Sequence, residues 1–241
     1  MGDPRKLAYL EALGVEAYVP RRGRPVDVAA TVATAATDAD PTAPASVASL
    51  GTVADLDWDS LRARVAACTR CELHATRTQT VFGVGNPRAR WMFIGEAPGA
   101  EEDKQGEPFV GRAGQLLNEI LKAVHFTRDE VYICNILKCR PPNNRDPLPS
   151  EVEQCEPYLH HQLRILQPKI ILALGRIAAQ TLLRTNDSLT KLRAGEHTYQ
   201  GIPLMVTYHP AALLRNPNWK RPTWEDVQKF RARYDAIVGA S

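Results

Sequence analysis

Four short segments of the chain are apolar at nearly every position: residues 90–95, 131–137, 169–175 and 203–209. A continuous apolar run of this length is typical of a strand buried on both faces of a parallel sheet. Apolar side chains recur at helical spacing between and after these segments, over residues 115–124, 150–166, 176–183 and 224–238. Strands that alternate with helices predict a three-layer α/β/α domain, whose ligands bind at the carboxyl ends of the strands. We expect the helix over 150–166 to open on Ser150, in a capping box with Glu153.

The chain before residue 58 has a different composition from the rest. Leucines at positions 7, 10 and 13 have helical spacing and are followed by Gly14, which predicts a short helix within residues 1–24. Residues 25–54 contain ten Ala, five Thr and three Pro but no aromatic residue, so they bury too little apolar area to offset the entropy of ordering. We therefore expect a short helical N-terminal extension (1–24), a flexible acidic linker (25–57) and one folded domain (58–241).

The overall composition excludes several classes of protein. Of the 241 residues, 44% are hydrophobic and 24% charged, as in ordinary globular proteins, and no apolar run approaches the ~18 residues of a membrane-spanning helix. The formal net charge of +3 divides into +2 over residues 1–24, −6 over residues 25–61 and +7 over residues 62–241. A basic body is compatible with a polyanionic partner, but an ordinary solvated surface is the simpler explanation of the charge alone.

The five cysteines are an odd number for a secreted disulfide framework. Ligation of a metal or cluster in a reducing compartment is the better interpretation, so we expect a cytoplasmic protein. Cys68 and Cys71 form a C-x2-C pair, and Cys139 and Cys155 complete a set of four thiolates that suits either zinc or a [4Fe–4S] cluster. The alternative of a buried, unliganded thiol suits Cys134, which lies in an apolar strand segment, and is weak for the C-x2-C pair among its polar neighbours.

The first predicted strand is followed by two glycine-rich segments, GEAPGAEED (95–103) and QGEPFVGRAG (105–114). Their glycines allow the backbone to approach a ligand closely. Phe109 in the second segment is suited to stacking on a base, although an aromatic residue that anchors the loop to the core is the commoner alternative. The acidic run has an alternative as well, since Asp and Glu favour the first turn of a helix.

Two other strand ends carry the polar candidates Asn135 and His209. The amide of Asn135 matches the O4 and N3–H edge of uracil, and His209 is placed to donate to a developing negative charge. Leu213 and Leu214 predict an apolar tip that wedges into a base stack, while Arg215 holds phosphate. The alternatives are an asparagine at a turn, a capping histidine and ordinary core leucines. Their shared position at strand ends favours one functional site.

Three segments of the chain, GEAPGAEEDKQGEPFVGRAGQLL, NILKCRPPNNRDP and HPAALLR, closely resemble family 4 uracil-DNA glycosylases, the iron–sulfur type. The resemblance runs from about residue 65 to residue 234. It implies a uracil-DNA glycosylase-like fold with a four-stranded parallel sheet. It also implies a DNA-repair enzyme that flips uracil out of DNA and hydrolyses its N-glycosidic bond, leaving an abasic site. Its partner would be uracil-containing DNA, single- or double-stranded, bound by a monomer. The resemblance does not cover residues 1–57, and the N-terminal extension is a candidate contact for a repair protein or has no part in catalysis.

The resemblance implies roles for individual residues. Glu102 would be the carboxylate most closely tied to activity, with Glu96 as its competitor for handling water, and His209 would stabilise the leaving uracil. Better-known uracil glycosylases have an Asp that serves the water where this chain has Ala97. The further implied roles are the [4Fe–4S] ligands Cys68, Cys71, Cys139 and Cys155, the pocket backbone at Gly95, Glu96 and Ala97, uracil binding by Phe109 and Asn135, and DNA contacts by Leu213, Leu214 and Arg215.

Two other functions compete with the glycosylase interpretation. A non-catalytic iron–sulfur or zinc module that binds nucleic acid would keep the scaffold and lose the pocket, yet the five pocket side chains Glu96, Glu102, Phe109, Asn135 and His209 are all present. A hydrolase of small nucleotides would have no use for the predicted apolar tip and its neighbouring cations. The residues therefore favour a glycosylase that acts on DNA.

Overall fold

Six strands form one mixed sheet, in the order β1-β3-β2-β4-β6-β5. The computed structural model describes residues 56–239, and the strands are β1 (Val84–Gly85), β2 (Trp91–Gly95), β3 (Tyr132–Asn135), β4 (Ile170–Leu174), β5 (His197–Tyr199) and β6 (Ile202–Thr207). The four predicted apolar segments contain, in chain order, β2, β3, β4 and β6. These strands lie in the order β3-β2-β4-β6 in the sheet and are parallel to one another. The expected four-stranded sheet is incomplete, because β1 and β5 add an antiparallel strand at each edge. Strands of two and three residues are too short to leave an apolar run in the sequence.

The α-helices are α2 (Trp58–Ala66), α3 (Ala100–Gln105), α4 (Arg112–Ala123), α5 (Pro149–Leu166), α6 (Arg176–Leu183), α7 (Leu189–Ala194), α8 (Pro210–Arg215) and α9 (Lys220–Gly239). Four of these α-helices, α4, α5, α6 and α9, lie close to the positions that the hydrophobic pattern predicts, and the other four were not predicted by it. Short 3-10 helices cover Glu72–Ala75, Arg128–Glu130, Pro142–Asn144 and Pro217–Trp219.

The start of α5 differs from the prediction. Its N-cap is Leu148, whose N–H donates to the carboxylate of Glu151 at 2.8 Å. Arg145 holds the same carboxylate through a hydrogen bond of 2.9 Å. The capping box expected from Ser150 and Glu153 is therefore wrong, because the carboxylate that caps the helix lies two residues earlier.

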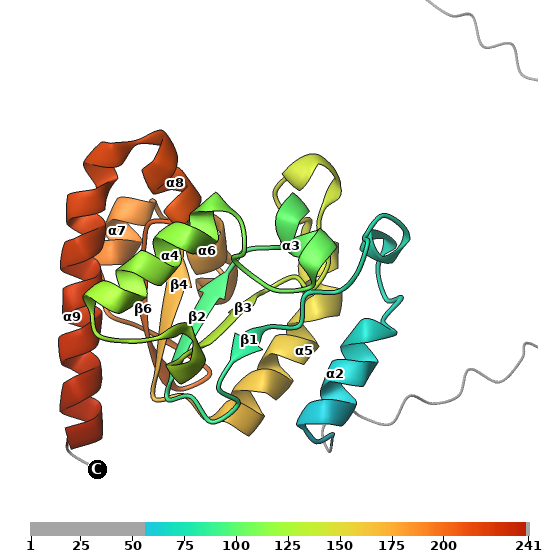
Figure 1. Cartoon of the computed structure of the whole chain (residues 1–241), viewed down its shortest axis with the longest axis horizontal. Helices are drawn as coiled ribbons and strands as arrows, with labels where there is room; N and C mark the ends of the chain where they lie inside the picture. Colours follow the sequence, from blue (N-terminus) through green and yellow to red (C-terminus); the bar gives the residue numbers. More distant parts are fainter. Residues whose placement is uncertain (1–55, 240–241) are drawn as a thin grey trace, which may run out of the picture. The chain divides into compact units, whose positions relative to one another are not determined.

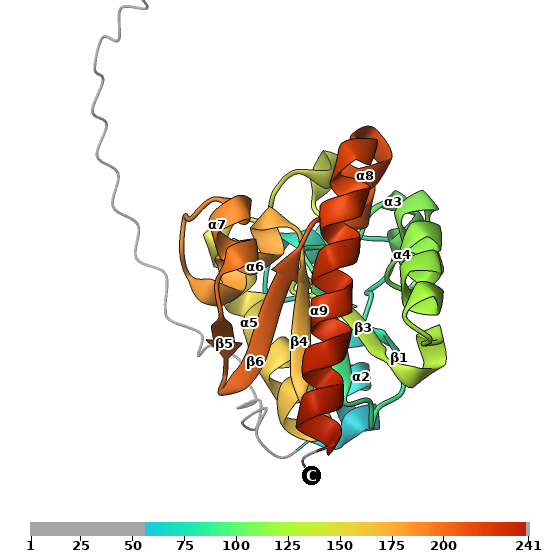
Figure 2. The same ribbon diagram turned by 90° about the vertical axis from the view of Figure 1, so that its left-hand side faces the viewer.

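Alternate residues of the central strands point to opposite faces of the sheet. In β2, Trp91 and Phe93 pack in one core with side chains of α4 and α9, whereas Met92 and Ile94 pack in the other with side chains of α5 and α6. Figures 1 and 2 show these helices covering the two faces of the sheet, which confirms the three-layer α/β/α architecture. Both layers leave the carboxyl ends of the parallel strands at one edge of the domain.

The predicted N-terminal extension over residues 1–24 and nearly all of the linker over 25–57 lie outside the described residues, and these expectations stay predictions. Within residues 56–239, no helix is long and apolar enough to cross a membrane.

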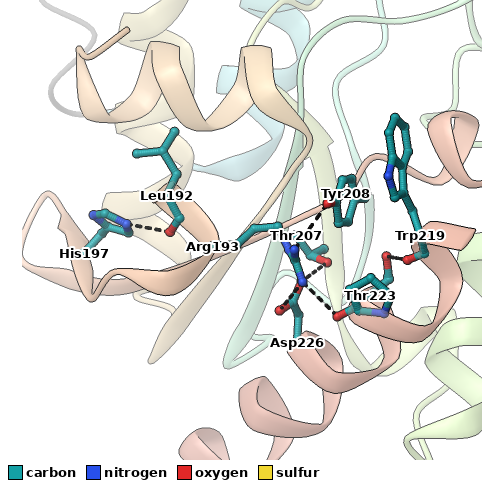
Figure 3. A network of polar contacts seen from close by, with 9 residues as sticks. Leu192, Arg193, His197, Thr207, Tyr208, Trp219, Thr223 and Asp226 are labelled. Carbon is teal, nitrogen blue, oxygen red and sulfur yellow. Dashed lines mark hydrogen bonds and ion pairs between the residues drawn. The ribbon is translucent and has the colours of Figure 1, made fainter. Parts of the chain in front are cut away.

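A buried ion pair fastens α7 to α9. The Nε of Arg193 lies 2.7 Å from Oδ2 of Asp226, and the two side chains are only 14% and 7% exposed. The hydroxyl of Thr207 donates to the same carboxylate at 2.8 Å, so the end of β6 joins the network (Figure 3). The network thus fixes the chain immediately before the loop that leaves β6.

We expect Asp226→Ala to lower the free energy of unfolding by about 3–5 kcal/mol, because it leaves the buried guanidinium of Arg193 without a carboxylate partner. Glu196→Ala is the matched control, since it removes an ion pair with Arg233 whose side chains are 83% and 39% exposed. That control should lose no more than about 1 kcal/mol. Urea unfolding of both variants measures the difference, and equal losses would contradict the role of the buried pair.

Candidate active site

The carboxyl ends of the parallel strands open into a cleft of about 820 Å³. The structure brings together here most of the side chains expected at the site from sequence. The expected residues that line the cleft are Glu96, Ala97, Glu102, Phe109, Asn135, His209 and Arg215. They come from five separate parts of the chain, which only the parallel sheet and its loops place at one edge.

Gly95 lies beneath the side chains of Asn135 and Phe109. It is the last residue of β2, and its register partner in β3 is Asn135. A Cβ at position 95 would overlap Oδ1 of Asn135 and would lie 2.8 Å from Cζ of Phe109. The absence of a side chain therefore lets the amide and the aromatic ring approach each other at the floor of the cleft.

Asn135 presents an unsatisfied acceptor to this floor. The residue is 2% exposed, and its Oδ1 has no hydrogen-bond partner among the described residues. A buried acceptor without a partner is costly unless a ligand supplies a donor. The geometry therefore fits a ligand with an N–H group that points at Asn135.

Glu102 holds the loop that carries Phe109. Its Oε1 accepts the backbone N–H groups of Val110 and Gly111 at 3.0 and 3.1 Å. Phe109 itself takes a left-handed backbone conformation with φ of 55° and is 6% exposed. Its ring contributes to the hydrophobic core and also lines the cleft, so core anchoring and ligand contact coexist in this residue.

His209 caps α8 and lines the cleft. Its Nδ1 accepts the N–H of Ala211 at 3.1 Å, which places the proton of the neutral ring on Nε2. Burial lowers the pKa of His209 to about 4, the charge of Arg215 acts in the same direction, and Glu102 opposes them. The ring is therefore neutral at physiological pH, and its Nε2–H is a hydrogen-bond donor. The centroids of the His209 and Phe109 rings are 5.4 Å apart.

Glu96 is the second carboxylate of the cleft. Burial raises its pKa to about 7, Asp146 adds to the effect, and Arg176 opposes it. About half of the Glu96 side chains are therefore protonated at pH 7. Ala97, next in the chain, also lines the cleft and packs against the cluster of apolar side chains around the cysteines.

The two leucines of the predicted apolar tip have different environments. Leu213 is 1% exposed and belongs to the buried core, whereas Leu214 is 39% exposed. The expectation of a two-leucine tip is therefore wrong for Leu213, because α8 turns adjacent side chains to different sides. Leu214 and Arg215 are both exposed, and Arg215 lines the cleft.

Four thiols line a separate cavity next to the cleft. Cys68 and Cys71 precede the sheet, Cys139 follows β3, and Cys155 lies in α5, yet all four face the same space. In the described part of the chain, no three Cys, His, Asp or Glu side chains gather as they do around a single metal ion. Cys134 is fully buried in the sheet core and does not line this cavity, which confirms the burial expected for this thiol.

Lys138 is a residue that sequence reasoning missed. It is 1% exposed, and its ammonium donates to the carbonyl of Asn135 and to Oε1 of Gln162, both at 2.7 Å. Its backbone N–H donates to Sγ of Cys155 at 3.2 Å. A lysine inside the apolar stretch that ends at Cys139 was the available signal, since buried lysines are rare without a counter-charge.

Comparison with known proteins gives the class of this site. A family model described as the Uracil DNA glycosylase superfamily matches residues 82–228, and the chain belongs to that superfamily. The type-4 uracil-DNA glycosylase of Archaeoglobus fulgidus is 43% identical over 180 residues, which cover 71% of this chain and 90% of that protein. The type-4 glycosylase of Thermotoga maritima is 45% identical over 173 residues, 70% and 90% of the two chains. A type-5 glycosylase of Pyrobaculum aerophilum is 30% identical over 215 residues, 76% and 94%. Within the superfamily, the chain is a member of the type-4 family.

Proposed function

We propose that this protein repairs DNA by hydrolysing the N-glycosidic bond of uracil, leaving an abasic site. Membership of the type-4 uracil-DNA glycosylase family supports this function. The single observation that carries the substrate assignment is the buried, unpartnered Oδ1 of Asn135. Uracil has an N3–H donor that satisfies this acceptor, whereas N3 of cytosine has no hydrogen.

The base is held between three groups of the cleft. Asn135 accepts from N3–H and donates to O4, Phe109 stacks on the ring, and Nε2–H of His209 reaches the O2 side. A base inside a duplex cannot enter such a site, so the nucleotide must be flipped out of the stack. The exposed Leu214 fills the gap, and Arg215 contacts the neighbouring phosphates.

The reaction breaks the bond between C1′ of the sugar and N1 of uracil. The electron pair moves onto uracil, and positive charge develops on the sugar before water adds to C1′. His209 donates a hydrogen bond to the uracil anion as a neutral ring, which the pKa near 4 ensures. Oε1 of Glu102 is engaged by the backbone after Phe109, so the other oxygen, Oε2, orients the water and accepts its proton, since Ala97 offers only a methyl group at this position.

We further propose that Cys68, Cys71, Cys139 and Cys155 hold a [4Fe–4S] cluster. The half-buried Arg77 and the buried Lys138 line the thiol cavity, and their positive charges suit an anionic group there. Arg77 donates from Nη1 to Sγ of Cys139 at 3.1 Å, and Lys138 has no carboxylate partner in the described structure. A zinc ion is the alternative occupant. A bound cluster would cross-link the segment of Cys68 and Cys71 to the segment of Cys139 and Cys155, and glycosidic hydrolysis, which transfers no electrons, would need no redox chemistry from it.

The competing functions account for less of the site. A non-catalytic nucleic-acid module leaves the orphaned acceptor of Asn135 and the neutral donor of His209 unexplained.

We propose single- and double-stranded uracil DNA as substrates, a monomer as the active species, the cytoplasm as its location, and residues 1–24 as the contact for a repair partner.

Replacement of Asn135 by Ala should lower kcat/KM on uracil-containing DNA by roughly 10- to 100-fold, because a buried hydrogen-bonding pair is lost. Asn143→Ala is the matched control, since Asn143 is exposed on the loop after β3 and does not line the cleft. Uracil release from a labelled oligonucleotide measures both variants. Activity of Asn135→Ala within about twofold of the wild type would overturn the recognition scheme, since the lost hydrogen bonds would then contribute almost nothing.

Glu102→Gln should reduce the single-turnover rate by about 100-fold or more, the usual contribution of a general base. Gln keeps an acceptor for Val110 and Gly111, so the Phe109 loop stays in place. Glu96→Gln should cost less than about tenfold, since about half of Glu96 is already protonated at pH 7.

The pH dependence of the single-turnover rate tests independently which of the two carboxylates, Glu96 or Glu102, acts as the base. The charged fraction of a group with a pKa of about 7 rises about tenfold between pH 6 and pH 8. The wild-type single-turnover rate should therefore change by less than about twofold over this range if Glu96 is not the base. A tenfold rise that Glu96→Gln abolishes would assign the water to Glu96 instead.

Arg77→Gln should lower the reduction potential of the cluster and speed its loss in air, because a cationic donor to Cys139 is removed. Arg70→Gln is the control, since Arg70 lines the same cavity but hydrogen-bonds Gln154 instead of a thiol. Iron and zinc content, visible absorbance and voltammetry of both variants give the readout. Stoichiometric zinc without iron in the purified protein would contradict the cluster assignment.

A further inference from the structure

A second aromatic surface lines the cleft on the His209 side. The rings of Tyr208 and Trp219 are stacked, with centroids 4.9 Å apart and an angle of 12° between their planes. Both residues line the same cleft as Phe109 and His209. The proposed recognition of uracil uses neither of these rings.

The Tyr208 ring is held in place by the buried network that joins α7 to α9. The guanidinium of Arg193 lies 4.4 Å from the Tyr208 ring centroid and donates to its hydroxyl at 3.3 Å. Figure 3 shows Tyr208 between Arg193 and Trp219. The backbone carbonyl of Trp219 accepts the hydroxyl of Thr223 at 2.7 Å, which ties this residue to the start of α9. The two rings therefore form a preorganised surface.

Trp219 remains 36% exposed in spite of this support. A large aromatic ring that is fixed on one face and solvated on the other is unusual in a core anchor and typical of a stacking platform for bases. Cations accompany it: Arg215 lines the same cleft, and Lys220 and Arg221 follow Trp219 directly in the chain and are exposed, Arg221 in an ion pair with Glu225. This combination of rings and cations suits single-stranded nucleic acid.

The size of the cleft leaves room for more than the flipped base. A water molecule takes roughly 30 Å³ in the liquid, so a volume of 820 Å³ corresponds to roughly 27 waters. Uracil has eight non-hydrogen atoms and fills only part of this space. Neighbouring nucleotides of the same strand can therefore enter the cleft with it.

We propose that Trp219, supported by Tyr208, is a second base-binding subsite that stacks a base adjacent to the flipped uridine. The proposal rests on the proposed glycosylase function and adds a contact outside the uracil pocket. The stacked base is of any type, because every base has a π face. The subsite contributes most on single-stranded DNA, where the flanking bases are free to leave their neighbours.

The test combines variants of the protein with changes in the substrate. Single-stranded oligonucleotides carry one uracil with normal neighbours, or with an abasic analogue at the 5′ or the 3′ neighbour. Wild-type kcat/KM should fall about tenfold when one of the two neighbouring bases is removed. The kcat/KM of Trp219→Ala should be about tenfold below the wild-type value on the normal oligonucleotide and should not change when the neighbouring base is removed. Trp219→Phe should retain most of the activity.

Trp224→Ala is the matched control, because Trp224 is 39% exposed on α9 and does not line the cleft. It should behave as the wild type on every substrate. A Trp219→Ala variant that is fully active, or that loses activity but stays sensitive to the missing base, would overturn the subsite. A wild-type protein that releases no uracil from any oligonucleotide would overturn the proposed function, whereas an active wild type without sensitivity to either neighbour would overturn the subsite alone.

Discussion

The site depends on the close approach of three segments over a residue that has no side chain. Gly95 ends β2 beneath Asn135 of β3 and the ring of Phe109, and a Cβ at this position would overlap the amide oxygen of Asn135. Phe109 keeps its place because Glu102 binds the backbone after it. Close packing thus sets the distance between the amide of Asn135, which we propose reads the base edge, and the ring of Phe109, which we propose stacks on the base.

A buried cation connects this floor to the cysteine cavity. The ammonium of Lys138 binds the backbone carbonyl of Asn135, and its backbone N–H binds Cys155. A charge that is 1% exposed needs a counter-charge nearby, and the anionic group proposed for the thiol cavity supplies it. The proposed [4Fe–4S] ligands and the proposed uracil site are therefore parts of one packed unit, although they occupy separate cavities.

The sequence predicts the central strands, the four longer helices that cover the sheet and most of the functional candidates that the cleft brings together, because buried parallel strands leave continuous apolar runs and functional loops follow their carboxyl ends. It misses the edge strands, which are too short for a pattern, and the true cap of α5, which depends on the tertiary contact of Arg145 with Glu151. It also groups Leu213 with Leu214, since adjacent leucines look alike until the helix assigns one to the core. Lys138 left a signal in the apolar stretch around it, but its partners become visible only in the structure, and the role of Trp219 becomes visible only through ring geometry.

The central claim is that Gly95 serves the placement of Asn135, and a double-mutant cycle tests it directly. Uracil release is measured for the wild type, Gly95→Ala, Asn135→Ala and the double variant. Because the added methyl group acts mainly by displacing Asn135, Gly95→Ala should cost much less in the Asn135→Ala background, with a coupling of at least about 1 kcal/mol. Effects that add within about 0.5 kcal/mol would show that the two positions act independently and would contradict the account.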